Sequence, residues 1–147
     1  MRSLLLVDDD ERTCEAVQRL LGRMGYVVVC ATKGADALAV LQDLRFELVV
    51  LDWMMPEMDG LEVLRQIRAD PHTRDVKVIL YSAADDPETC RQAIKLGAND
   101  CVLKSGGFFA LYDRIEQLLR LDDESPAANQ SGMADASTAA TPRRSAR

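Results

Sequence analysis

The sequence predicts an α/β fold in which five parallel strands form a doubly wound sheet in the order 2-1-3-4-5. Three observations support this prediction. Short apolar segments alternate five times with segments whose apolar residues recur at helical spacing. The strand segments are nearly continuous runs of leucine and β-branched residues, as expected of strands that are buried on both faces. Right-handed crossover connections leave few other topologies for such a chain.

The elements are expected in strict alternation along the chain. The strands are predicted at residues 4–7, 27–30, 48–51, 76–80 and 101–103. The helices are predicted around residues 14–24, 35–41, 61–67, 87–94 and 111–119. Gly25 is expected to follow the end of the first helix, and Pro71 to end the third. Asp86 is expected to cap the fourth helix, with Pro87 at its first position.

One domain with a tail is the expected organisation. A length of 147 residues with 48% hydrophobic residues suits one globular domain. We predict that the domain covers residues 1–121 and that residues 122–147 form a disordered tail rich in alanine and serine. The tail has too little apolar side chain to offset the entropy lost on ordering.

Charge and hydropathy exclude several classes of protein. The formal net charge of −6 gives no long-range attraction to phosphates, so no direct contact with nucleic acid is expected. No apolar run approaches the roughly 18 residues of a membrane span, and the N-terminus lacks the features of an export signal. A cytoplasmic location is therefore expected. The four cysteines have no close spacing and are predicted to be thiols: Cys14, Cys30, Cys90 and Cys101.

Polar side chains follow four of the predicted strands. Asp8 and Asp9 come after the first strand and Asp52 after the third. Ser82 follows the fourth strand and Lys104 the fifth. Each has an ordinary explanation by itself, because acids cap helices or form turns and a lysine is usually a solvated charge. The carboxyl ends of parallel strands meet at one edge of the sheet, however, so we expect these side chains to converge.

The converging acids predict a site for a divalent cation. Three carboxylates repel one another unless positive charge compensates them, and Lys104 supplies only one charge. Mg²⁺ or Mn²⁺ would neutralise the rest, because such cations prefer carboxylate oxygens and water. Asp8, Asp9 and Asp52 are the predicted ligands. Asp9 is expected to bind the ion directly, and Asp8 directly or through water. The main-chain carbonyl of Met54 is a further candidate ligand.

A neutralised pocket of this kind suits phosphoryl transfer. Asp52 is central among these groups and is the predicted nucleophile, because a carboxylate can form an acyl phosphate. Ser82 and Lys104 are expected to hold the phosphoryl oxygens. The small side chains of Ala83 and Ala84 leave room for the phosphoryl group.

Four motifs occur in order along the chain: Val7-Asp8-Asp9, the segment 51–60 with sequence LDWMMPEMDG, the segment 80–83 with sequence LYSA, and Lys104 after GAND at 97–100. With these motifs, residues 2–121 resemble the receiver domain of two-component response regulators. The resemblance implies a flavodoxin-like fold and a phosphoacceptor switch rather than an enzyme. It also implies that a histidine kinase or phosphotransfer protein presents phosphohistidine, that Asp52 takes the phosphoryl group, and that Ser82 reports the phosphorylated state.

The resemblance further implies output through binding of a downstream protein. No output domain is recognisable in the sequence, so a stand-alone receiver is expected. The candidate surface is the fourth helix, fifth strand and fifth helix, with Arg91, Lys95, Phe109 and Tyr112 as candidate contacts. The two aromatic residues have an equal alternative role in packing the edge of the core. Dimerisation on phosphorylation is a further alternative.

Four positions depart from the receiver pattern. Receivers usually carry proline after the lysine, where this chain has Ser105, and an aromatic three residues before it, where this chain has Cys101. The latter departure excludes the familiar rotation of an aromatic ring in signal output. Met54 and Ala84 are apolar where many receivers have polar side chains beside the path of hydrolytic water. We therefore predict a long-lived phosphoryl group.

Three other functions remain open as alternatives. A receiver-like module that binds its partner without phosphorylation is supported by Cys101 and Ser105. An aspartate-nucleophile phosphatase needs a second acid two residues after the nucleophile, where this chain has Met54. A nucleotide- or flavin-binding sheet needs a glycine-rich phosphate loop after the first strand, where none occurs.

Overall fold

The computed structural model describes residues 2–83 and 86–123. The chain divides into two compact units, residues 1–115 and 116–147; the described part of the second unit, residues 116–123, is the end of one helix. The strands are β1 (Ser3–Val7), β2 (Val27–Ala31), β3 (Leu48–Leu51), β4 (Lys77–Ser82) and β5 (Asp100–Leu103). The helices are α1 (Glu11–Arg23), α2 (Gly34–Asp43), α3 (Gly60–Ala69), α4 (Pro87–Lys95), the 3₁₀ turn η1 (Lys104–Gly106) and α5 (Phe108–Asp123).

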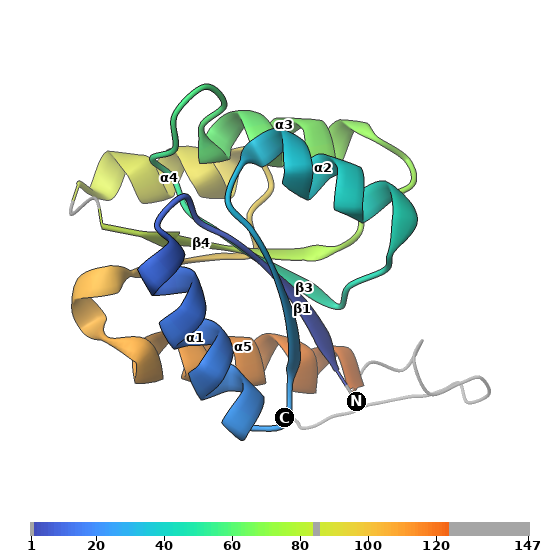
Figure 1. Cartoon of the computed structure of the whole chain (residues 1–147). Helices are drawn as coiled ribbons and strands as arrows, with labels where there is room; N and C mark the ends of the chain where they lie inside the picture. Colours follow the sequence, from blue (N-terminus) through green and yellow to red (C-terminus); the bar gives the residue numbers. More distant parts are fainter. Residues whose placement is uncertain (1, 84–85, 124–147) are drawn as a thin grey trace, which may run out of the picture. The chain divides into compact units, whose positions relative to one another are not determined.

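The five strands form one parallel sheet in the order β2-β1-β3-β4-β5, which confirms the predicted topology. Helix α1 and the first residues of α5 cover one face of the sheet, and α2, α3 and α4 cover the other (Figure 1). Val7 of β1 pairs with Leu51 of β3, which pairs with Leu80 of β4. This register brings the carboxyl ends of the three strands to one edge.

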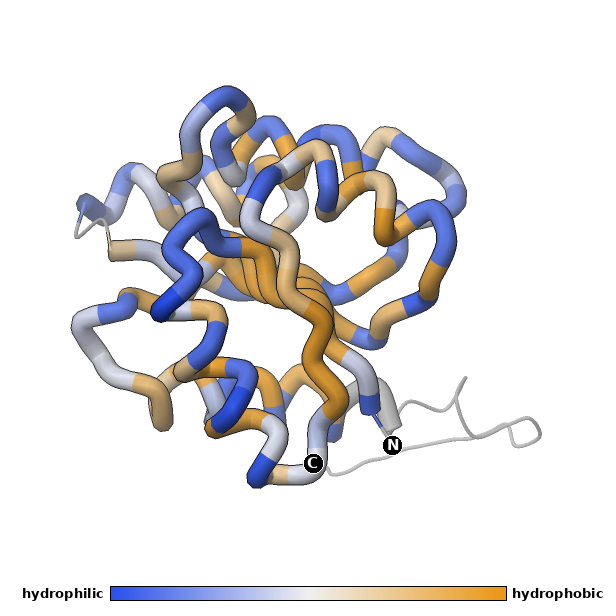
Figure 2. The backbone as a smooth tube through the Cα atoms, viewed as in Figure 1, coloured by the Kyte–Doolittle hydropathy of each residue, from blue (hydrophilic) through white to orange (hydrophobic). Residues whose placement is uncertain are grey.

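The central strands form the apolar core of the first unit. Every residue of β3 and all but the first residue of β1 are buried. The apolar residues gather along the sheet in the middle of the domain, with polar residues on the outer turns and helices (Figure 2). Burial of side chains on both faces explains why these strands are continuous apolar runs rather than alternating ones.

The predicted C-terminal end of α1 and the predicted cap of α4 are confirmed. The carboxylate of Asp10 accepts a hydrogen bond from the amide of Arg12 at the start of α1, and Gly25 follows that helix with φ of 98°. Asp86 caps α4 in the same way, with Pro87 at its first position. Strand β4 is longer than predicted and ends at Ser82, so the Ser82 side chain belongs to the strand and is fully buried.

The prediction of four thiols is wrong for two of the cysteines. Cys90 of α4 and Cys101 of β5 form a disulfide, with their Cα atoms 5.6 Å apart. The tight turn between α4 and β5 brings the helix back beside the strand. A separation of 11 residues does not by itself reveal this contact. Cys14 and Cys30 are thiols, as predicted.

The predicted tail lies almost entirely outside the described residues. Only residues 122 and 123 of the range 122–147 are described, and they are the last residues of α5. The domain boundary at 121 therefore stays a prediction. Among residues 2–83 and 86–123, no helix is both long and apolar enough to span a membrane.

Candidate functional site

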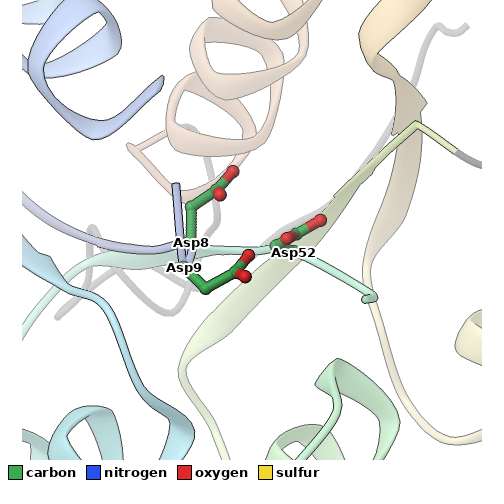
Figure 3. Close-up of side chains that lie close together, drawn as sticks. All are labelled: Asp8, Asp9 and Asp52. Carbon is green, nitrogen blue, oxygen red and sulfur yellow. The ribbon is translucent and has the colours of Figure 1, made fainter. Parts of the chain in front are cut away.

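Three carboxylates meet at the carboxyl edge of the sheet. Asp8 and Asp9 follow β1, and Asp52 follows the neighbouring strand β3 (Figure 3). One carboxylate oxygen from each residue lies within 4.8 Å of the others. Asp8 is 1% exposed and Asp52 is 6% exposed, whereas Asp9 is open to solvent. The structure thus places two buried charges beside one exposed charge.

The backbone hydrogen bonds of the sheet position these acids. The amide of Asp52 donates to the carbonyl of Val7 at 2.9 Å, and the amide of Asp8 donates to the carbonyl of Ala31 at 3.1 Å. The carboxylate of Asp8 also accepts a hydrogen bond from the amide of Asp10 at 2.9 Å. Strand pairing therefore continues one residue past β1 and β3 and fixes both acids.

Lys104 approaches the pocket from the end of β5. Its Nζ lies 2.7 Å from Oδ2 of Asp8 and 3.5 Å from Oδ1 of Asp52. The same Nζ lies 5.7 Å from the centre of the Tyr81 ring. Burial lowers the pKa of Lys104, but the hydrogen bond to Asp8 and the charge of Asp52 outweigh burial and raise it. Lys104 is therefore a fixed positive charge at the site.

One lysine does not neutralise the pocket. Burial and the charge of Asp8 raise the pKa of Asp52 to about 6, and Lys104 offsets this only in part. The three carboxylates face the single ammonium of Lys104, so negative charge is in excess here. A set of closely spaced carboxylate oxygens with excess negative charge fits Mg²⁺ or Mn²⁺.

The loop between β3 and α3 packs directly against Asp52. A Cβ atom on Gly60 would lie 2.2 Å from the main-chain oxygen of Asp52, so only glycine fits there. The amide of Gly60 donates to the carbonyl of Trp53 at 2.8 Å. Asp59 caps α3 through a hydrogen bond from the amide of Glu62 at 3.0 Å. The segment after Asp52 is therefore a tightly closed loop, although the Met54 side chain within it is 65% exposed.

A second tight turn lies within the same loop. The amide of Met58 donates to the carbonyl of Pro56 at 2.7 Å, and Glu57 between them has φ of 70°. This is the geometry of a γ-turn, which places a non-glycine residue in an uncommon backbone region. Such conformations persist only where the surrounding structure holds them.

The remaining predicted site residues lie on β4 and β5. Ser82 ends β4, opposite Leu103 of β5, and Ala83 follows it in an exposed position. Cys101 lies opposite Leu80, three residues before Lys104. The strand register places Ser82 at the same edge of the sheet as the carboxylates. Ala84 lies outside the described residues.

Sequence reasoning missed three residues at or near the site. Tyr81 lies beside Lys104, and its place before Ser82 was the available signal. The Cys14 thiol donates to the main-chain oxygen of Asp8 at 3.3 Å. Cys90 bonds to Cys101, and nothing in its spacing pointed to that partner.

The fold and the pocket together define a flavodoxin-like α/β domain with an acidic cation-type site at its switch point. A family model described as the response regulator receiver domain matches residues 4–116. The chain therefore belongs to the receiver domains of two-component response regulators, as the sequence motifs indicated.

Individual relatives agree with this assignment. The chain is 38% identical over 118 residues to response regulator RR06 of Streptococcus pneumoniae serotype 2, covering 80% of this chain and 53% of that protein. Among solved structures, the receiver domain of Francisella response regulator 1452 is 26% identical with a TM-score of 0.77, covering 83% of this chain and 99% of that chain. The response regulator TrrA of Thermotoga maritima, solved in complex with Mg²⁺ and BeF, is 31% identical with a TM-score of 0.72, covering 80% and 99%.

The chain spans about half the length or less of the curated relatives it matches. It covers 53% of RR06 and 32% of the transcriptional regulatory protein ZraR of Escherichia coli. The family match at residues 4–116 identifies the shared region as the receiver domain. The activities of the full-length relatives depend on further regions of those proteins.

Proposed function

We propose that this receiver is a phosphoacceptor switch in which Asp52 takes a phosphoryl group from phosphohistidine on a histidine kinase or phosphotransfer protein. The position of Asp52 carries the proposal, because its buried carboxylate has an oxygen within 4.8 Å of the two acids after β1 and lies 3.5 Å from the ammonium of Lys104. In the reaction a carboxylate oxygen of Asp52 attacks phosphorus and the phosphorus–nitrogen bond breaks. The imidazole leaves, and Asp52 becomes an acyl phosphate.

The chain's own residues have distinct parts in this reaction. Asp8, Asp9 and Asp52 would hold Mg²⁺ or Mn²⁺, with the main-chain carbonyl of Met54 as a further ligand. The metal, when bound, neutralises charge on the carboxylates and the incoming phosphoryl group. The ammonium of Lys104, which pairs with Asp8 and lies 3.5 Å from Asp52, would bind the phosphoryl oxygens.

Ser82 and Ala83 complete the proposed phosphoryl site. The hydroxyl of Ser82 is offered as the second donor to the phosphoryl oxygens, and the small side chain of Ala83 leaves space beside it. Because Ser82 ends β4, a shift of its hydroxyl is transmitted to the segment that leads into α4.

Output by protein binding follows from the same arrangement. The proposed surface comprises α4, β5 and the first residues of α5, on which Arg91, Lys95 and Phe109 are exposed. Tyr112 is half-buried and stacks on Phe108, which supports its packing role. We place this switch in the cytoplasm. The prediction of no direct contact with nucleic acid rests on the net charge of −6.

Trp53, the only tryptophan, adjoins Asp52 and provides the test. Its fluorescence is expected to change on addition of Mg²⁺, and again on addition of acetyl phosphate or beryllofluoride. Asp52→Asn should abolish the second change, whereas Asp36→Asn, an exposed acid on α2, should preserve both. After incubation with acetyl phosphate, the intact mass should rise by one phosphoryl group in the unmodified chain and in Asp36→Asn, but not in Asp52→Asn.

A receiver-like module that works without phosphorylation is the second candidate. The observation that favours it is Cys101, which replaces the usual aromatic and is covalently bonded to α4. An unchanged mass after incubation with acetyl phosphate and Mg²⁺, in both the oxidised and the reduced chain, would favour this candidate and contradict the first.

A further inference from the structure

The disulfide between Cys90 and Cys101 joins two elements of the proposed output surface. Cys90 lies in the first half of α4, and Cys101 lies in β5 opposite Leu80 of the neighbouring strand. Their Cα separation of 5.6 Å is within the ordinary range for a disulfide. Both residues are half-buried, so neither sulfur is sealed in the core.

The bond joins the two elements that are adjacent in the chain to the proposed phosphoryl-binding residues Ser82 and Lys104. The chain passes from Ser82 through residues 83–86 into α4, which carries Cys90. It leaves β5 at Leu103 and continues directly into Lys104, three residues after Cys101. A covalent link between Cys90 and Cys101 therefore holds α4, which follows Ser82 along the chain, against β5, which directly precedes Lys104.

The two other cysteines provide an internal comparison. Cys14 is 4% exposed and lies on the buried face of α1. Its thiol donates to the carbonyl of Asp8 at 3.3 Å, and the thiol of Cys30 donates to the carbonyl of Cys14 at 3.7 Å. Thiols held in this way are poor nucleophiles at neutral pH. Exchange chemistry is therefore expected at the other pair.

Cys90 is also approachable from the surface. It lines a surface hollow on α4 together with Pro87, Glu88, Arg91, Ile94 and Lys95. The cations of Arg91 and Lys95 favour a sulfur that carries negative charge, although Glu88 pairs with Arg91 at 3.1 Å. A thiol reagent thus has access to one end of the bond.

We infer that Cys90 and Cys101 form a thiol–disulfide exchange site, and that its redox state sets how freely α4 moves against β5. The inference rests on the proposed function for its setting, because cytoplasmic disulfides are usually transient or redox-sensing rather than structural. The co-reactants are a dithiol reductant for opening and a small-molecule disulfide for closing.

The exchange is balanced in both directions. A thiolate of the reductant attacks Sγ of Cys90, the sulfur–sulfur bond breaks, and Cys101 leaves as a thiolate that takes a proton. The second thiol of the reductant attacks the mixed disulfide, and Cys90 leaves and is protonated. The protein gains two electrons and two protons, and the reductant becomes a disulfide. In closing, the Cys90 thiolate attacks the small-molecule disulfide and releases one thiol; the Cys101 thiolate then attacks Sγ of Cys90 in the mixed disulfide and releases the second thiol.

Alkylation of the full chain tests the site directly. After incubation with glutathione disulfide, the peptides carrying Cys90 and Cys101 are expected to resist alkylation in denaturant, while Cys14 and Cys30 are labelled. After incubation with dithiothreitol, all four should be labelled. Labelling of Cys90 and Cys101 in both samples would overturn the inference.

Hydrogen exchange tests the effect on α4. Amides of residues 87–95 are expected to exchange about tenfold more slowly in the disulfide form than in the reduced form, because local opening of α4 is restrained. The double variant Cys90→Ser/Cys101→Ser should exchange rapidly under both conditions, and Cys30→Ser should keep the difference. Equal exchange in both redox forms of the unmodified chain would overturn the proposed role of the bond.

Beryllofluoride binding separates this inference from the proposed function. If both hold, the apparent affinity measured by Trp53 fluorescence should differ about threefold or more between the redox forms, and the double variant should match the reduced form. Equal affinities would overturn the coupling between the bond and the switch. If beryllofluoride bound neither redox form, the proposed function would be contradicted. Alkylation and hydrogen exchange would still show whether Cys90 and Cys101 form an exchange site.

Discussion

The Nζ atom of Lys104 lies 2.7 Å from Oδ2 of Asp8, a residue 96 positions earlier in the chain whose side chain is 2% exposed. This contact gives the buried carboxylate of Asp8 its positive partner. Asp52 lies farther from the same ammonium, at 3.5 Å, and its pKa is raised to about 6. The single positive charge of Lys104 is thus shared unequally between two buried acids.

Lys104→Gln is expected to destabilise the chain when no divalent cation is present. The change leaves Asp8 buried without its ion-pair partner, which should lower the free energy of unfolding by about 3 kcal/mol. It also makes the pocket more negative, so Mg²⁺ should bind several-fold more tightly. Urea unfolding and Mg²⁺ titration of Trp53 fluorescence measure the two effects. Lys95→Gln, an exposed lysine on α4, is the control, and equal behaviour of the two variants would contradict the prediction.

The raised pKa of Asp52 predicts a pH dependence of stability without metal. The pKa is about 6 in the folded chain and about 3.9 in an unfolded chain, so the folded chain binds more protons at Asp52 between those values. The contribution of Asp52 to the free energy of unfolding therefore falls as pH rises from about 4 to about 6 and then levels off.

Asp52→Asn should remove that dependence. At neutral pH the variant is expected to be more stable by roughly 2 to 3 kcal/mol, because it buries no charge. The advantage should shrink toward about pH 4, where the carboxyl group of the unmodified chain is protonated. Urea unfolding at several pH values measures the difference, and parallel curves for the two chains would rule out this account. Saturating Mg²⁺ should reduce the advantage at neutral pH.

Met54→Asn is expected to shorten the lifetime of the acyl phosphate. Met54 lies two residues after the acceptor and is 65% exposed, and an amide there can bind water near the phosphoryl group, which methionine cannot do. Phosphoryl loss should be several-fold faster, measured by intact mass after removal of the phosphodonor. Met24→Asn, another exposed methionine at the end of α1, should leave the decay unchanged. The hypothesis fails if Met54→Asn decays at the original rate.

Gly60→Ala is expected to disrupt the acceptor loop. Its new methyl group would lie 2.2 Å from the main-chain oxygen of Asp52, so the backbone must shift at a cost of about 2 kcal/mol or more. Gly22→Ala is the matched control, because no atom beyond its chain neighbours and the backbone of α1 itself lies within 4 Å of its new methyl group. Gly22→Ala should stabilise the chain by about 0.5 to 1 kcal/mol. Thermal unfolding and beryllofluoride binding should separate the two variants, and equal effects would exclude this role for Gly60.

The sheet and the acidic pocket were predictable because each depends on a repeated local signal. Alternation of apolar runs with helical spacing gave the strand order, and parallel pairing then placed Asp8, Asp9 and Asp52 at one edge. The same reasoning placed Lys104 beside them without any knowledge of distances. Asp10, although part of the same acidic run, caps α1, as acids after strands often do.

Contacts made by single long side chains were not predictable. Arg68 of α3 donates to the carbonyls of Gly97, Arg74 and Val76 and to the side chain of Asn99, which joins α3 to the two segments that lead into β4 and β5. Nothing in the spacing of these residues indicates such a hub. The disulfide was missed for the same reason, because pairing depends on the turn geometry between α4 and β5 rather than on a sequence pattern.

The residues of the proposed acceptor site come from the ends of β1, β3, β4 and β5, and neighbouring strands contribute them from distant parts of the chain. A fragment that carries only the Asp52 loop consequently lacks most of the pocket. Binding of a phosphate mimic therefore also reports that the whole sheet has assembled correctly. Two complementary halves of the chain would bind the mimic only if they associated with one another.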